Sequence, residues 1–379
     1  MKPKILVTGG GTSGHISPAL ALIQTLRDLE PQAEFLYIGS QKGLEKGLVE
    51  AAKVPFVPIS TGKLRRYLSV ENLVDQFRIP VGVFQSLAHV RRFRPDVVIA
   101  TGGYVAVPPV LAAAMCRVPI LIHEQTVQIG LANQINARFA SKIALSWPRA
   151  MESLPPKFHP KAWIAGNPVR PSVFGGNSQK ALEFFRLSNE NLPAIYITGG
   201  SLGAQTINRA VEEVLPQLLE HARIIHQCGK QPEGSEQDFD RLERAAAALP
   251  ANLRSRYALT RFVGDEIAHV FALADLVVSR AGASTLTELC ALGKPALYVP
   301  LVPTGGDEQT KNAQMSETVG AAKILLQNQI SGESLLRTIV EMLGDRARLL
   351  KMGQAARTLA RPDAAREIAS AVLKLAQTK

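Results

Sequence analysis

The chain of 379 residues has few cysteines, few aromatic side chains and no long apolar run. Its three cysteines, Cys116, Cys228 and Cys290, stand far apart in apolar contexts, so we expect reduced thiols and no disulfide scaffold or cysteine metal site. No run of roughly 18 or more apolar residues occurs, which excludes a predicted membrane-spanning helix. Only three apolar residues follow Met1–Lys4, too few for a signal peptide, and a cytoplasmic location is expected.

Charged residues are also sparse, at 20% against 46% hydrophobic, which excludes a disordered chain and indicates an ordinary globular protein. The length predicts two domains. Acidic residues are scarce in the first half: residues 1–165 hold 19 Lys and Arg but 10 Asp and Glu, whereas residues 166–379 hold 24 and 22. The net charge of +11 therefore lies mostly in the first half.

Cations surround an apolar segment, residues 73–84, in this basic half. They are Lys63, Arg65, Arg66, Arg78, Arg91, Arg92 and Arg94. This combination suits an anionic membrane surface, and a solvated helix face is the alternative. A nucleic-acid partner is not expected, because aromatic side chains do not alternate with the cations as stacking platforms would.

Short apolar runs alternate with helical stretches and predict a doubly wound parallel sheet. The expected strands are residues 4–8, 35–38, 56–59, 97–100, 120–122 and 143–145. Six prolines within 148–171 indicate an inter-domain connection. A strand at 194–198 then restarts the pattern, so the sequence predicts two Rossmann-like domains. An amphipathic helix is expected at 363–377.

Glycine turns follow the first strand of both halves. Gly9, Gly11 and Gly14 satisfy G-x-G-x-x-G, but the next strand ends at Ser40 without the acid that a dinucleotide ribose requires. The turn at residues 199–203 precedes a helix and predicts either a phosphate cradle or a tight turn without ligand.

The apolar run at 274–278 predicts a buried strand. Residues 279–313 then predict a turn at 280–283, a helix from about Ser284, a strand at 296–299 and a polar loop. Thr285 and Glu288 fit a capping box. Glu288 is therefore either the capping partner of Thr285 or a ligand for the two hydroxyls of a ribose. The polar loop at 305–312 has few apolar groups to pack, which favours a binding site.

His15 closes the first glycine turn where a helix is expected to start. The positive end of the helix dipole favours a neutral imidazole that can accept a proton from a sugar hydroxyl. Glu124, in His123-Glu124-Gln125, follows another strand of the same domain. It can orient His15, bind an acceptor or satisfy nearby backbone amides, and spacing alone does not decide between these roles.

Several motifs occur in the order found in one enzyme family. They are residues 9–15, 102–104, 123–125, 130–133, 166–170, 199–204, 280–288 and 307–313. Together they resemble the glycosyltransferase family 28 enzymes that complete the lipid-linked peptidoglycan precursor. The resemblance implies a GT-B fold, with two Rossmann-like domains whose parallel sheets face a central cleft. It implies an acceptor and membrane-associated domain at 1–165, a donor domain at 166–362 and a C-terminal helix, 363–379, packing back across the junction.

The resemblance implies inverting transfer of N-acetylglucosamine from UDP-N-acetylglucosamine to the C4 hydroxyl of an undecaprenyl-pyrophosphate-linked muramyl pentapeptide, without cofactor or metal, by a peripheral enzyme on the cytoplasmic face of the membrane. His15 and Glu124 are the implied catalytic residues. The implied donor-binding residues are Arg170, Gly200, Ser201 and Gly203 for the diphosphate, Phe262 and Val263 for uracil, Glu288 for ribose, and Glu308 and Gln309 for the sugar, with Ala283 beside them. The implied acceptor-binding residues are Thr12, Ser13, Gly14, Tyr104, Thr126 and Asn133.

Two acceptor-side positions differ from the family pattern, since Ser13 replaces a glycine and Thr126 an asparagine. The spacing from Val263 to Asp275 is also one residue longer. Two other functions fit the same scaffold: a UDP-N-acetylglucosamine epimerase, which needs no acceptor, and a donor-binding protein without catalysis.

Overall fold

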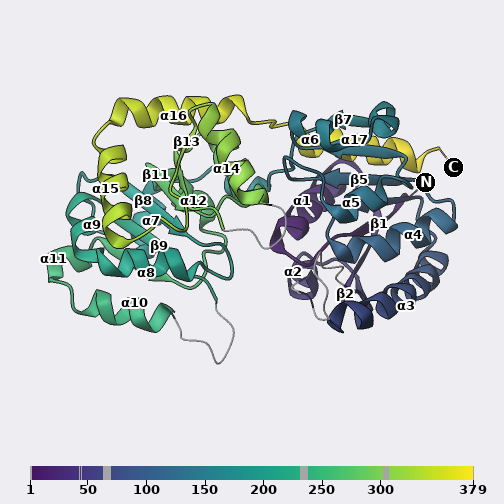
Figure 1. The fold of residues 1–379 in the computed structure, drawn as a ribbon, viewed down its shortest axis with the longest axis horizontal. Coiled ribbons are helices and arrows are strands. Elements are labelled where there is room, and N and C mark those ends of the chain that lie inside the picture. Colours follow the sequence, from purple (N-terminus) through teal and green to yellow (C-terminus); the bar gives the residue numbers. More distant parts are fainter. Residues whose placement is uncertain are drawn as a thin grey trace. The chain divides into compact units, whose positions relative to one another are not determined.

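The structure, a computed structural model, describes residues 2–41, 43, 45–62, 70–230, 238–301 and 307–378. The chain forms two compact units. Unit 1 comprises Met1–Arg170 and Arg361–Lys379, and unit 2 comprises Pro171–Ala360. Each unit carries its own parallel sheet with helices on both faces (Figure 1), which confirms the predicted doubly wound architecture.

The sheet of unit 1 has the order β3-β2-β1-β4-β5-β6-β7 within the described residues. Every pairing in it is parallel. Its strands are β1 Lys4–Thr8, β2 Glu34–Ser40, β3 Phe56–Ile59, β4 Val97–Ala100, β5 Ile120–Glu124, β6 Lys142–Leu145 and β7 Ala162–Ile164. The order reverses direction between β1 and β4, and such switch points are where doubly wound sheets bind their ligands.

Alternate residues of β1 point to opposite faces of this sheet and seed two cores. Ile5 and Val7 pack in a cluster with Ile368 and Val372 of the C-terminal helix, whereas Leu6 packs in a second cluster. The helices of unit 1 are α1 Ser13–Leu29, α2 Glu45–Ala51, α3 Val70–Phe93, α4 Val107–Met115, α5 Leu131–Asn136, α6 Pro148–Ser153 and α17 Ala364–Ala376, with short 3-10 turns η1 Tyr104–Ala106 and η2 Pro156–Lys161.

Unit 2 repeats the design with the order β10-β9-β8-β11-β12-β13, again parallel throughout the described residues. Its strands are β8 Ala194–Thr198, β9 Arg223–Gln227, β10 Tyr257–Thr260, β11 Leu276–Ser279, β12 Ala296–Tyr298 and β13 Ala322–Ile324. Its helices are α7 Ser178–Phe185, α8 Gln205–Glu213, α9 Leu215–His221, α10 Asp238–Ala247, α11 Ala251–Arg254, α12 Ile267–Leu273, α13 Ala283–Leu292, α14 Glu308–Thr318, α15 Gly332–Leu343 and α16 Arg346–Thr358, with the 3-10 turn η3 Pro171–Val173. The order reverses between β8 and β11.

The proline-rich span at 148–171 is not a simple connection. Pro148 starts α6 and Pro156 starts η2, positions where proline loses no helical hydrogen bond, and the chain then adds β7 to the edge of the sheet. These two prolines therefore mark the starts of short elements of unit 1. Of the three free cysteines, Cys228 and Cys290 are buried as expected, but Cys116 is half-buried.

Replacing Ile368 by Ala should destabilise unit 1, although residue 368 follows the whole of unit 2 in the chain. The side chain is fully buried between α17 and the sheet. Loss of the methylenes, and the cavity left behind, should lower the free energy of unfolding by about 2–5 kcal/mol, measured by urea denaturation. Leu350→Ala is the matched control, because that leucine is 64% exposed; equal losses in both variants would contradict the assigned packing.

Candidate active site

In both units a glycine turn with candidate site residues lies where the strand order reverses. The turn Gly9–His15 follows β1 and Gly102–Tyr104 follows β4 in unit 1. In unit 2, residues 199–203 follow β8 and residues 280–283 follow β11. Ligands of doubly wound sheets bind at such switch points. The topology thus assigns one candidate site to each unit.

The first glycine turn is held by an internal carboxylate. The backbone N–H of Gly11 donates to Oε1 of Glu45 at 2.7 Å, and the Ser40 hydroxyl donates to the other oxygen at 3.1 Å. Glu45 is fully buried. An amide that would face a phosphate in a dinucleotide site is therefore already occupied by an anion. Sequence reasoning did not identify Glu45, because nothing in its local pattern marks it.

The hydrogen bonds of His15 fix its tautomer. Nδ1 lies 3.1 Å from the carbonyl oxygen of Thr101 and 2.9 Å from Oε1 of Gln125. A carbonyl oxygen only accepts, so Nδ1 must carry the proton and Nε2 keeps its lone pair. In this tautomer the half-buried imidazole can accept a proton at Nε2.

Gln125 orients this histidine through a buried chain of amide contacts. Its Nε2 donates to Thr101 O at 2.7 Å and to Nδ1 of His123 at 3.0 Å, which leaves Oε1 toward His15. His123 Nε2 donates to Gly166 O at 3.0 Å. Burial lowers the pKa of His123 to about 4, so this ring is neutral near pH 7. The side chain that orients His15 is thus Gln125 and not Glu124.

Glu124 instead accepts hydrogen bonds from the loop that follows it. Its Oε1 accepts from the backbone N–H and the hydroxyl of Thr126, and its Oε2 accepts from Gly130 N and Asn133 Nδ2 at 3.0 Å each. Of the three roles left open by the sequence, these contacts match the satisfaction of nearby amides. The buried Oδ1 of Asn133 has no hydrogen-bond partner among the described residues.

The other acceptor-side residues gather at the same turn. Thr12 precedes α1 as its N-cap residue and is exposed, and Ser13 and Gly14 form the first helical positions. The ring of Tyr104 lies against Gly11, where a β-carbon would come within 2.6 Å of it. Gly11 also has a φ of +86°, so glycine is required here on both grounds.

The second glycine turn rests on the end of β9. Gly203 has a φ of +79°, and a β-carbon there would meet Cys228 O at 1.9 Å. Gln227 Nε2 donates to Gly200 O at 3.0 Å, and its Oε1 accepts from Val263 N at 2.9 Å. Gln227 therefore ties the turn to the loop after β10. It was missed from the sequence because β9 itself was not predicted.

The capping box at Thr285 is wrong. Helix α13 begins at Ala283 after Gly282 as N-cap, without a side-chain cap. Thr285 and Glu288 therefore both lie inside the helix. Glu288 is 7% exposed on this helix, and the ribose-binding role stays a prediction. Arg280 donates to Val299 O at 2.9 Å, and burial lowers its pKa to about 10, so it remains charged.

The last candidate residues surround the start of α14. Glu308 is its first residue and Gln309 accepts from Leu301 N at 2.9 Å. Asn312 donates to Ala281 O at 3.1 Å, while its buried Oδ1 has no partner among the described residues. Part of the predicted polar loop, Gly305 and Gly306, lies outside the described residues. Arg170 belongs to unit 1.

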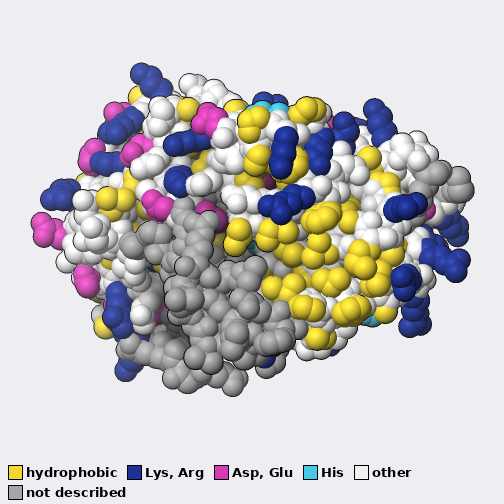
Figure 2. All heavy atoms as spheres, turned by 45° about the vertical axis from the view of Figure 1, so that its right-hand side comes forward, with side chains coloured by type: hydrophobic (Ala, Val, Ile, Leu, Met, Phe, Trp, Pro, Cys, Tyr) yellow, Lys and Arg dark blue, Asp and Glu magenta, His cyan; other side chains and the backbone are white. Residues whose placement is uncertain are grey.

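An exposed apolar surface covers part of unit 1. Figure 2 shows hydrophobic side chains gathered on this face with Lys and Arg side chains at its border. Among the side chains of α3 and α4 that the structure describes, the large exposed ones are Val81, Phe84 (70% exposed) and Met115. Arg91 and Arg92 lie in the last turn of α3. Of the predicted cations, Lys63, Arg65 and Arg66 lie outside the described residues. Among the helices described, none is long and apolar enough to cross a membrane.

Two parallel-sheet units with ligand sites at their switch points define the GT-B class of glycosyltransferases. The chain belongs to glycosyltransferase family 28: the model of its N-terminal domain matches residues 5–145 and that of its C-terminal domain residues 194–368. The GT-B architecture expected from the sequence is thereby confirmed.

Two relatives are similar over most of their length. Both carry the name UDP-N-acetylglucosamine--N-acetylmuramyl-(pentapeptide) pyrophosphoryl-undecaprenol N-acetylglucosamine transferase, one from Bacillus thuringiensis (number 3; 38% identical, covering 89% of this chain and 91% of the relative) and one from Listeria monocytogenes (38%, 98% and 99%). The crystal structure of Acinetobacter baumannii MurG matches with a TM-score of 0.73 at 29% identity, covering 98% and 99%. A putative UDP-N-acetylglucosamine 2-epimerase from Listeria monocytogenes shares the fold, at a TM-score of 0.70 and 14% identity.

Acid should destabilise unit 1 through His123. Its folded-state pKa lies near 4 and its unfolded pKa near 6.5, so the unfolded chain binds more protons between these values. Stability should fall as the pH drops below 6.5, by about 3 kcal/mol in total at pH 4. Urea unfolding at pH 7 and 4.5 measures this loss.

His123→Gln should lose less stability than the wild type between these pH values, because it removes the titrating ring. His221→Gln, at an exposed position, is the control and should keep the wild-type dependence. Identical acid dependence in wild type and His123→Gln would contradict a buried neutral His123.

Proposed function

We propose that this protein transfers N-acetylglucosamine from UDP-N-acetylglucosamine to the C4 hydroxyl of the muramyl sugar on undecaprenyl-pyrophosphate-linked muramyl pentapeptide, with inversion at the sugar. Membership of family 28 and the names of the near full-length relatives support the substrates. The observation that carries the proposal is the tautomer of His15. Its protonated Nδ1 is held by Thr101 and Gln125, which leaves Nε2 as a base.

The acceptor is assigned to unit 1. His15 Nε2 takes the proton from the C4 hydroxyl as this oxygen attacks the anomeric carbon. Asn133, whose Nδ2 donates to Glu124 at 3.0 Å, is assigned to the acceptor side with it. Glu124 contributes indirectly, because it accepts hydrogen bonds from Asn133 and from the loop at Thr126. Tyr104 and residues 12–14 complete this surface.

The donor is assigned to unit 2. The backbone N–H of Ser201 stabilises the negative charge that grows on the leaving diphosphate, since the Gly200 and Gly203 N–H groups already donate to Thr198 Oγ1 and Gly200 O. The role implied for Arg170, a residue of unit 1, stays a prediction. Glu288 binds the ribose hydroxyls beside Ala283, and Glu308 and Gln309 bind the sugar. Uracil lies beside Phe262 and Val263. Because the Val263 N–H already donates to Gln227, recognition there uses the Val263 carbonyl, which accepts from the uracil N3–H.

His15→Asn should lower kcat by about 10²–10⁴-fold with an unchanged KM for the donor. The asparagine amide replaces the Nδ1 donor toward Thr101, but no atom replaces the Nε2 base. Transfer is measured with radiolabelled UDP-N-acetylglucosamine and lipid-linked muramyl pentapeptide, and His221→Gln is the control.

Three results would contradict the proposal in different ways. An undiminished kcat in His15→Asn would contradict the role of His15 as the general base. A wild type without transfer activity would indicate a donor-binding protein. Conversion of the sugar with donor alone would indicate an epimerase.

We also propose that the protein binds the cytoplasmic membrane surface peripherally through Val81, Phe84 and Met115, with the neighbouring arginines facing anionic headgroups. Phe84→Ser should reduce sedimentation with vesicles containing phosphatidylglycerol, because a 70% exposed ring is lost from the contact. Leu350→Ser, on an exposed leucine of unit 2, should sediment like the wild type. Equal sedimentation of Phe84→Ser and wild type would overturn this surface.

A further inference from the structure

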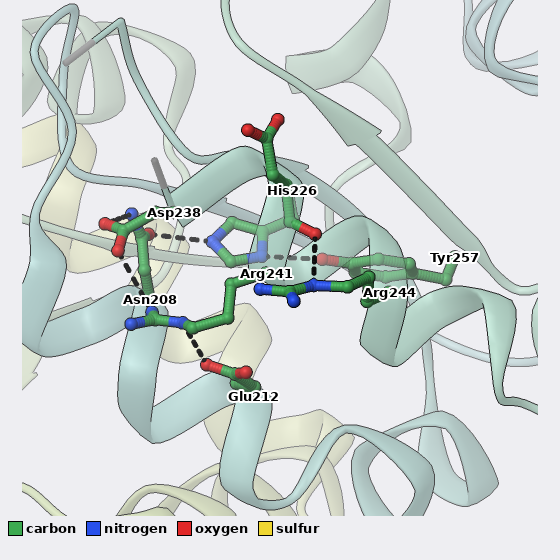
Figure 3. Close-up of polar contacts among 8 residues, drawn as sticks. Asn208, Glu212, His226, Asp238, Arg241, Arg244 and Tyr257 are labelled. Carbon is green, nitrogen blue, oxygen red and sulfur yellow. Dashed lines mark hydrogen bonds and ion pairs between the residues drawn. The ribbon is translucent and has the colours of Figure 1, made fainter. Parts of the chain in front are cut away.

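Figure 3 shows a buried relay of polar side chains in unit 2. It joins Tyr257 on β10, His226 on β9, Asn208 on α8 and Asp238 at the start of α10. The side chains of Asn208, His226 and Asp238 are fully buried. Arg241 closes the far end, contacting Asp238 at 3.0 Å and Glu212 at 2.6 Å.

The donor and the acceptor of each hydrogen bond in this relay follow from the chemistry of the groups. Asn208 Nδ2 faces two acceptors, Asp238 Oδ2 at 2.7 Å and Cys228 O at 2.9 Å, so Asn208 Oδ1 faces His226 and must accept from its Nε2–H at 3.0 Å. His226 Nδ1 then accepts from the Tyr257 hydroxyl at 2.9 Å. Burial lowers the pKa of His226 to about 3 and raises that of Tyr257, which keeps both groups neutral in these roles.

The side chain of Asn208 contacts the donor side at the carbonyl oxygen of Cys228. Cys228 directly follows Gln227, whose side chain holds Gly200 and Val263. The next residues, Gly229 and Lys230, lie against the turn: a β-carbon on Gly229 would meet Gly203 N at 2.0 Å, and Lys230 N donates to Ser201 O at 2.9 Å. The position of residues 227–230 therefore sets the position of the turn.

We propose that Asn208 is a positioning residue for the UDP-sugar, because its hydrogen bond to Cys228 O, oriented by His226, holds the end of β9 against the glycine turn. Asn208 contacts no donor-binding residue of the proposed site directly. The inference rests on the proposed function for the identity of the donor. It adds a residue about which neither motif nor spacing gave a signal.

Exchanging the amide and the acid separates this role from a purely structural one. Asn208→Asp places two carboxylates together and turns an oxygen toward Cys228 O, so both stability and donor binding should suffer. Asp238→Asn keeps the Asn208 bond to Cys228 and should lower stability alone. The double variant restores an amide–carboxylate pair between positions 208 and 238, but its Cys228 O still faces an acceptor.

The double variant should therefore recover melting temperature relative to Asn208→Asp without recovering donor affinity. We expect the Kd for UDP, measured by calorimetry, to rise about tenfold in Asn208→Asp and in the double variant, the effect of one lost hydrogen bond at the site. It should be unchanged in Asp238→Asn. The KM for UDP-N-acetylglucosamine should follow the Kd, with kcat altered less.

The inference is overturned if the wild type binds UDP and Asn208→Asp binds it equally well, or if affinity recovers together with stability in the double variant. A wild type that binds UDP but transfers no sugar overturns the transferase and leaves these Kd values to decide the inference. A wild type that binds no UDP overturns the donor site and the inference with it.

Discussion

The reversal of strand order in each parallel sheet is the constraint on which the two candidate sites depend. Between β1 and β4, and again between β8 and β11, neighbouring strands send their following loops to opposite sides. The sheet itself does not fill the space between these loops, so polar turns lie side by side there. His15 contacts Thr101, which directly follows β4, for this topological reason. The 199–203 turn contacts residues 227–230 at the end of β9, the strand on the other side of β8.

Both units hold their turns with a glutamine that follows or ends a strand next to a buried neutral histidine. Gln125 joins Thr101, His15 and His123, and Gln227 joins Gly200 and Val263 beside His226. A primary amide has both donors and an acceptor, so it can bind a carbonyl and an N–H at once without introducing charge. Neutral groups suit these places, because an ion buried so deeply would require a partner.

The sequence was sufficient for elements with a strong local signal and insufficient where the signal is tertiary. Continuous apolar runs predicted β1, β4 and β8, because strands buried on both faces carry little else. Strand β9, with Arg223 and His226 among its five residues, escaped prediction because its polar side chains are satisfied by distant partners. The capping box at Thr285 failed because Gly282 starts the helix earlier than the motif implies. Motifs located His15 and residues 123–125, but the roles of Gln125 and Glu124 follow from hydrogen-bond directions, which spacing does not contain.

The two glycine turns show how one local motif can serve opposite ligands. Each follows the first strand of its sheet and precedes a helix, so each offers backbone N–H groups at a positive helix end. In unit 1 Glu45 accepts from Gly11 and brings a negative charge into the turn, which favours a neutral hydroxyl ligand near His15. In unit 2 the Gly200 N–H donates to Thr198 Oγ1 and the Gly203 N–H to Gly200 O, while Gln227 and Lys230 N donate to Gly200 O and Ser201 O; the Ser201 N–H has no partner among the described residues. The first turn thus contains a carboxylate and the second has one N–H open to an anion, and this difference supports the proposed diphosphate site in unit 2.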